Sequence, residues 1–163
     1  MKTNPKHQLV GRIRTCIWIV TVGLFLSGVT AFPIEAELRW LVNLSTNGGF
    51  VNNWLFTVYH AVQTTNKYYP YLSYGTDWLA FAHIILAVLF AGALRDPQRN
   101  IWIIEFGIIA ALAIFPLAFI AGSIRGIPIF WRLIDCSFGI VTLTLLLPCY
   151  NMIKKLNSLK SLF

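Results

Sequence analysis

Charged residues are scarce in this chain, and their scarcity argues against an ordinary soluble domain. Only 12% of the 163 residues are charged, whereas 57% are hydrophobic. A soluble domain usually carries about 25% charged residues. The length is enough for one domain, and so much apolar surface on so short a chain predicts a protein that lies in a lipid bilayer.

The sequence also lacks the short motifs of several enzymes and cofactor proteins. No two of its three cysteines, Cys16, Cys136 and Cys149, form a Cys-x-x-Cys motif, which argues against a thiol oxidoreductase. No His-Glu-x-x-His is present, and no two histidines share a face within a hydrophobic segment. Zinc-protease and bis-histidine haem chemistry are therefore not indicated. There is also no glycine-rich phosphate loop. From these absences together, neither a metal nor a particular cofactor is predicted.

The net charge of +7 raises the question of nucleic-acid binding. In nucleic-acid-binding proteins the basic residues gather on one face or along one helix. Here they flank the apolar segments, which is how membrane proteins use Lys and Arg. We therefore expect no nucleic-acid partner.

Four hydrophobic segments are long enough to cross a bilayer, whose hydrocarbon core needs roughly 20 helical residues. They cover about residues 16–34, 77–94, 101–122 and 131–149. The first is too long for the core of a secretion signal and lacks a convincing small-x-small cleavage site, so we expect a retained anchor. The predicted fold class is an all-α integral membrane protein. It is a four-transmembrane-helix bundle that forms a single domain over residues 1–163.

The basic residues also predict the orientation of this bundle. Nine Lys and Arg residues flank one set of helix ends, and four flank the other. Cytoplasmic loops carry the excess of Lys and Arg, so we expect both termini in the cytoplasm, as in a multi-pass protein of a bacterial inner membrane. The connection over residues 95–100 is then a tight cytoplasmic turn between antiparallel helices, with Asp96-Pro97 as its turn signal.

The outer connection over about residues 35–76 is long, and it contains predicted helices rather than open loop. Residues 34–44 have the pattern of a short helix, stopped by an Asn-Gly-Gly sequence. Residues 50–65 place apolar side chains on one helical face and polar ones, His60 among them, on the other. This pattern predicts an outer interfacial amphipathic helix between the first two spans, as an anchor or as a lid over a cavity. Tyrosines at residues 68–74 would supply an aromatic belt.

Ionisable residues inside the predicted spans are candidates for function, because a charge in mid-bilayer costs about 2.5–3.5 kcal/mol on insertion scales. Asp77 opens the second span, where it can cap the helix together with Thr76. His83 lies about 120° around the same helix, and it can either hold a neighbouring helix or carry a proton. Glu105 lies one turn into the third span and needs a partner there.

Arg132 and Asp135 begin the fourth span. They are three residues apart, so they lie on one helical face and can form an ion pair. Arg132 can extend to the outer boundary, but Asp135 lies about one turn deeper on a short side chain and needs a partner or water. The pair either fixes helix register or forms the floor of a polar pocket, with Arg125 and Asp77 at its rim.

These positions together predict an outward-facing polar pocket. The predicted ligand-binding residues are Asp77, His83, Arg125, Arg132 and Asp135, extended by Arg39, His60 and Glu105. Both signs of charge in one pocket suit the head group of a small amphiphile or a membrane lipid, which the protein would bind or carry. Transport by so few helices would need a homodimer. Two alternatives stay open: a membrane enzyme that uses Asp135, His83 or Glu105 for acid–base chemistry, and an assembly subunit without a ligand site.

Small residues at four-residue spacing predict which helix faces pack closely. Such faces let two helix backbones approach each other within a membrane. They are formed by Gly23, Ser27 and Ala31 in the first span, by Ala87 and Ala91 in the second, and by Gly107 and Ala111 in the third.

Overall fold

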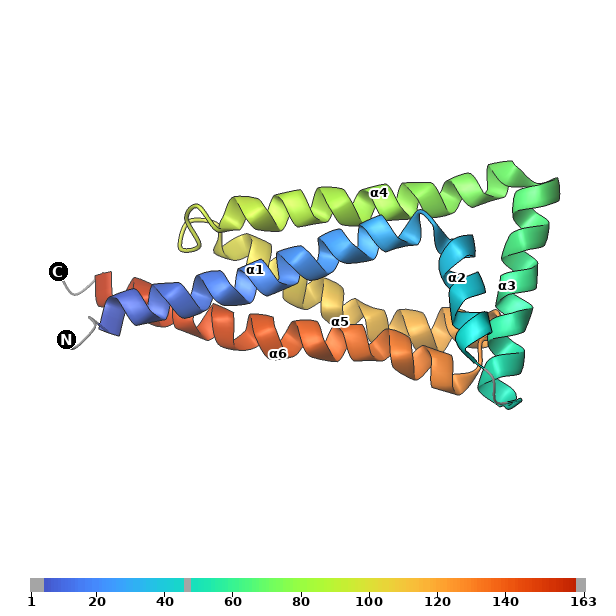
Figure 1. Cartoon of the computed structure of the whole chain (residues 1–163). Coiled ribbons are helices and arrows are strands. Elements are labelled where there is room, and N and C mark those ends of the chain that lie inside the picture. Colours follow the sequence, from blue (N-terminus) through green and yellow to red (C-terminus); the bar gives the residue numbers. More distant parts are fainter. Residues whose placement is uncertain (1–4, 46–47, 161–163) are drawn as a thin grey trace. The chain divides into compact units, whose positions relative to one another are not determined.

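The structure, a computed structural model, describes residues 5–45 and 48–160. Within these ranges it contains six α-helices and no strand (Figure 1): α1 (Pro5–Ala31), α2 (Ile34–Leu44), α3 (Phe50–Tyr68), α4 (Pro70–Ala93), α5 (Ile101–Ile124) and α6 (Ile129–Lys160). Four of them, α1, α4, α5 and α6, are long and apolar enough to cross a membrane. The predicted fold class, an all-α membrane helical bundle, is confirmed.

The helix boundaries differ from the prediction most clearly at prolines. α1 ends at Ala31 and a separate helix follows Pro33, because proline lacks an N–H for the helical ladder and disfavours helical dihedral angles in the residue before it. α4 begins at Pro70, since proline suits the first turn, where its missing N–H costs nothing. Asp77 therefore lies about two turns inside α4, and its predicted role at the helix start is wrong.

The chain forms two compact units. Unit 1 comprises Met1–Thr21 and Val88–Phe163, and unit 2 comprises Val22–Ala87. The helices α1 and α4 each contribute residues to both units. The prediction of a single membrane domain over residues 1–163 therefore stays a prediction.

In unit 1, α5 and α6 pack as an antiparallel hairpin (Figure 1). Glycines allow the close approach. A Cβ atom at Gly107 would lie 2.6 Å from the side chains of Phe90 and Leu146, and one at Gly139 would lie 2.9 Å from the carbonyl oxygen of Ala111. Such contacts are what hold helices together where lipid removes the hydrophobic driving force. The small-residue face predicted for the third span is confirmed.

In unit 2, α1 and α4 approach each other at Gly28. A Cβ atom at Gly28 would lie 2.7 Å from the carbonyl oxygen of Ala80 and 2.7 Å from Cγ1 of Ile84. The predicted stripe through Gly23 and Ser27 is exposed, and a Cβ atom at Gly23 would meet no described residue within 4 Å. This stripe therefore makes no close approach within the described chain, and a contact between two copies stays a prediction. Spacing identifies a face of small residues but does not tell which such face turns toward a neighbour.

The helices α2 and α3 lie side by side and antiparallel (Figure 1). Both occur where the sequence predicts them, although α3 continues to Tyr68 and Asn47 of the predicted stop lies outside the described residues. Leu38 of α2 is buried, and Leu55 and Val58 of α3 are half-buried. The position of α3 at a membrane interface stays a prediction.

Candidate ligand-binding site

Unit 2 contains an open cavity of about 500 Å³. It is formed by the connection between α1 and α2, the first turns of α2, the last turn of α3 and the first turns of α4. Its apolar lining residues are Phe32, Pro33, Ile34, Ala36 and Pro70, and its polar lining residues are Glu35, Arg39, Asn66, Ser73, Thr76 and Asp77. The volume lies within the range of small-molecule sites.

Helical spacing brings these polar side chains to the cavity. Glu35 and Arg39 are four residues apart and therefore share one face of α2. Ser73, Thr76 and Asp77 share one face of α4 for the same reason. This arrangement depends on α4 beginning at Pro70, because a helix that began at Asp77 would leave Ser73 in a loop.

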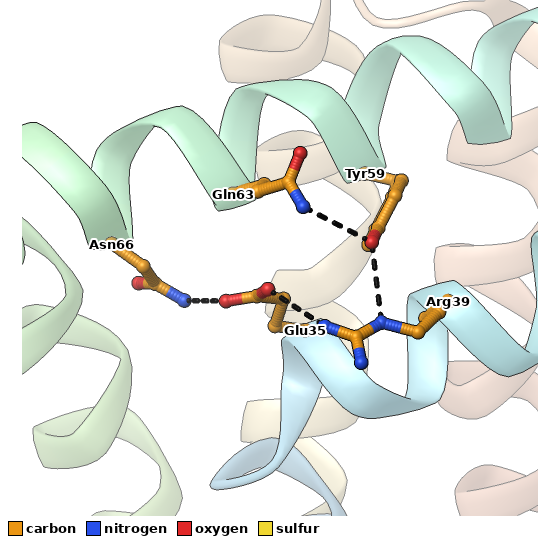
Figure 2. Close-up of polar contacts among 5 residues, drawn as sticks. All are labelled: Glu35, Arg39, Tyr59, Gln63 and Asn66. Atoms are coloured by element: carbon orange, nitrogen blue, oxygen red, sulfur yellow. Dashed lines mark hydrogen bonds and ion pairs between the residues drawn. The ribbon is translucent and has the colours of Figure 1, made fainter.

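Hydrogen bonds connect α2 to α3 along one side of the cavity (Figure 2). Nη2 of Arg39 forms an ion pair with Oε1 of Glu35 at 3.2 Å, and Nδ2 of Asn66 donates to Oε2 of Glu35 at 2.6 Å. Nε of Arg39 donates to the Tyr59 hydroxyl at 3.2 Å. Gln63 donates to the same hydroxyl at 3.3 Å. Both carboxylate oxygens of Glu35 are thus occupied, which fixes the orientation of this side chain.

Asn66 extends the hydrogen-bond network to a third helix. The hydroxyl of Ser73 on α4 donates to Oδ1 of Asn66, whose amide nitrogen donates to Glu35. One side chain at the end of α3 therefore links α2 and α4. A connected network of this kind holds its members in place better than separate pairs would.

The described lining residues leave the cavity with one excess negative charge, from the two carboxylates Glu35 and Asp77 and the single guanidinium of Arg39. The hydrogen bond to Tyr59, and then the hydrogen bond and charge of Glu35, raise the pKa of Arg39, whose guanidinium is protonated at neutral pH in any case. Asp77 is half-buried, and none of the described residues forms a hydrogen bond or an ion pair with its carboxylate. Among the described charged residues that line the cavity, Asp77 is thus the one that has no ion-pair partner.

Arg132 lies in unit 1, where it closes the turn between α5 and α6. Its Nε donates to the carbonyl oxygen of Ile127 at 2.6 Å, and its Nη1 donates to the Ser123 hydroxyl at 2.7 Å. It forms no ion pair with Asp135, although both residues are described. The predicted pair is therefore wrong, because the turn offers Arg132 a backbone carbonyl and a hydroxyl.

The other predicted site residues of unit 1 differ in exposure. Asp135 is half-buried on α6, whereas Arg125 at the end of α5 and Glu105 near its start are exposed. None of the three lines the cavity of unit 2. Their assignment as ligand contacts stays a prediction.

The two predicted histidines belong to unit 2, and neither lines its cavity. His60 is exposed on α3 and lies edge-on against Phe56, with ring centroids 4.6 Å apart. Nδ1 of His83 lies 2.8 Å from the carbonyl oxygen of Leu79, one turn earlier on α4. That geometry assigns the proton of the neutral ring to Nδ1, since a carbonyl can only accept. Of the eight predicted residues, the cavity brings together Arg39 and Asp77.

Four polar lining residues are not among the predicted ligand contacts: Glu35, Asn66, Ser73 and Thr76. For Glu35 a signal was present, because its i,i+4 spacing with Arg39 is typical of a pair on a helix surface. For Thr76 the sequence predicts only a role as a helix cap. No sequence pattern indicates Asn66 or Ser73 as a ligand contact. Their side chains come together because α3 ends at Tyr68 and α4 begins at Pro70.

Comparison with protein-family models, with curated proteins and with solved structures gives no match. In residues 5–45 and 48–160, no three His, Cys, Asp or Glu side chains are grouped as metal ligands would be. The chemistry of the cavity is therefore the basis for assigning a function.

Proposed function

We propose that the protein binds the polar head group of a small amphiphile, such as a membrane lipid, in the cavity of unit 2. The observation that carries this proposal is the mixed lining of the cavity, which combines apolar residues with charged and hydrogen-bonding side chains. Phe32, Pro33 and Ile34 are among the apolar lining residues, and Glu35, Arg39 and Asp77 are the charged ones. Small-molecule sites commonly combine apolar surface with a few fixed polar groups, which is what an amphiphile requires.

Exposed aromatic side chains support a position of the cavity at the level of lipid head groups. Tyr71, Tyr74 and Trp78, in the first turns of α4, are all exposed. Tyr and Trp are enriched where a membrane meets water, because they combine an apolar ring with a polar group. The same segment of α4 lines the cavity through Ser73 and Asp77. A bilayer lipid would thus meet the cavity at the depth of its own head group.

The basic residues support an outer location for this cavity. We infer that both termini lie in the cytoplasm of a bacterial cell, because nine basic residues flank their side of the predicted spans and four flank the other. The cavity lies where α1 ends and α4 begins, which are the helix ends opposite the N-terminus and the turn at residues 94–100. It would then open on the outer face of the inner membrane.

The two alternatives receive less support. An acid–base enzyme would use Asp135, His83 or Glu105, and none of these lines the cavity. An assembly subunit would not need an open cavity lined by Asp77, a half-buried carboxylate that has no partner among the described residues. We propose binding rather than transport, which would require a second copy of the chain.

The substitution Ala36→Trp tests the proposal by filling the cavity without changing its charge. Ala36 lines the cavity, and Ala61 of α3 is also an exposed alanine but does not line it. Native mass spectrometry of protein extracted from membranes in mild detergent should show a retained amphiphile on the wild type and on the Ala61→Trp control. The Ala36→Trp protein should lose it. Equal retention by all three proteins would overturn the proposal.

A further inference from the structure

We propose that the cavity selects an amphiphile whose head group carries a primary ammonium group beside an anionic oxygen. This inference rests on the proposed function of the cavity and specifies its ligand. The observations behind it are the excess negative charge of the cavity, the different situations of its two carboxylates, and the unused donors of Arg39.

The charge of the ligand follows from the two carboxylates. Glu35 is bound by Arg39 at 3.2 Å and by Asn66 at 2.6 Å, so a positive charge already accompanies it. Asp77 has neither kind of partner among the described residues and is half-buried. A carboxylate that is partly removed from water favours a nearby cation. The ligand should supply that cation.

The hydrogen-bonding groups favour a primary ammonium over a quaternary one. A primary ammonium has three N–H donors. Acceptors for them lie on one face of α4, in the carboxylate of Asp77 and the hydroxyl of Thr76. A quaternary ammonium has no donor and is bound by cages of aromatic rings. Among the described lining residues Phe32 alone is aromatic, so the cavity contains no such cage.

Arg39 accounts for the anionic oxygen. Its guanidinium has five N–H donors, of which Nε binds Tyr59 and one on Nη2 binds Glu35. Nη1 forms no hydrogen bond with the described residues and can bind a phosphate or carboxylate oxygen of the ligand. Phosphoethanolamine, the head group of a common class of phospholipid, places an ammonium two carbons from such a phosphate. Free zwitterions share this chemistry, but the exposed aromatic residues of α4 favour a lipid source.

The test compares head groups on identical acyl chains. The full chain in detergent is titrated with dihexanoyl phosphatidylethanolamine and with dihexanoyl phosphatidylcholine, its N-trimethyl analogue, and binding is measured by native mass spectrometry. The wild type should bind the phosphatidylethanolamine about tenfold more tightly or better, as expected for a hydrogen bond to a charged group. Asp77→Asn should abolish this preference. Glu37→Gln removes an acid of α2 that does not line the cavity, and it should keep the preference.

Each outcome separates this inference from the proposed function. Equal affinity of the wild type for both lipids, with binding still blocked by Ala36→Trp, overturns the ammonium selection and leaves the binding function intact. A preference that survives Asp77→Asn also overturns the assignment. Failure of both lipids to bind overturns the proposed function as well. Competition by soluble O-phosphoethanolamine at the same concentration as the lipid supports the ammonium chemistry and assigns it to a free zwitterion.

Discussion

Arg132 and Arg39 show two uses of a guanidinium in this chain. Arg132 binds a backbone carbonyl and a serine hydroxyl at the turn between α5 and α6, and so stabilises a local structure. Arg39 binds Glu35 and the Tyr59 hydroxyl, and its Nη1 forms no hydrogen bond with the described residues. Helical spacing alone would pair Arg132 with Asp135, yet the oxygens of the turn occupy it. For Arg132, the oxygens of the turn are the partners, and the carboxylate three residues further along the helix is not.

The role of Arg132 can be tested by comparing Arg132→Met with Asp135→Asn. Arg132→Met leaves the carbonyl oxygen of Ile127 without its donor and should lower the free energy of unfolding by about 1–3 kcal/mol. Asp135→Asn removes no described ion pair and should change it by less than about 0.5 kcal/mol. Thermal unfolding in detergent measures both. Equal destabilisation by the two substitutions would point back to an ion pair between these residues.

The elements of this fold could be predicted from the sequence far better than their contacts could. The spans and the helices α2 and α3 follow from apolar length and spacing, which are local properties. The start of α4 at Pro70 was missed because a tyrosine-rich segment with a proline has the composition of a loop. The Glu35–Asn66–Ser73 connection could not be predicted, since it depends on the register of α2 against α3 and on the turn at Tyr69. The contribution of Asn66 and Ser73 to the cavity lining could therefore not be predicted.

The link between three helices can be tested at Asn66. Asn66→Leu removes the hydrogen bond to Glu35 and the one from Ser73. Each such bond contributes about 0.5–1.5 kcal/mol, and up to 3 kcal/mol where a partner is charged. The backbone amides of α2 and of the first turn of α4 should therefore exchange hydrogen for deuterium about tenfold faster or more. Asn53→Leu, on the exposed face of α3, should leave this exchange unchanged. The same protection in both variants would show that the network does not hold the helices.

The whole molecule is a membrane bundle whose surface is largely apolar. In the four candidate spans only 22–28% of the residues in the most apolar window are buried by other parts of the chain. Large exposed side chains such as Ile109, Leu117 and Phe138 are therefore left for lipid, or for a second copy of the chain, to cover. Lipid tails are as apolar as leucine, so this exposure carries no penalty in a bilayer. It is consistent with the scarcity of charge in the sequence.

The orientation of the bundle belongs to this scale and depends on the basic residues. Green fluorescent protein fused after Phe163 should fluoresce, because that end is expected in the cytoplasm. Alkaline phosphatase fused after Gly48, in the outer connection, should be enzymatically active outside the inner membrane. The reverse pattern, with active phosphatase after Phe163, would invert the topology and move the cavity to the cytoplasmic face.

The claim that the cavity of unit 2 binds an amphiphile is tested most directly by cross-linking. A photoactivatable phosphatidylethanolamine, with its diazirine close to the head group, is incorporated into membranes that contain the full chain. Its adducts are then mapped on peptides by mass spectrometry. The account predicts adducts concentrated in residues 32–39 and 66–77, which contain all the described lining residues, and loss of these adducts in Ala36→Trp. Adducts concentrated on residues 123–135, or spread over the exposed apolar surface of α5 and α6 without enrichment at the cavity, would contradict it.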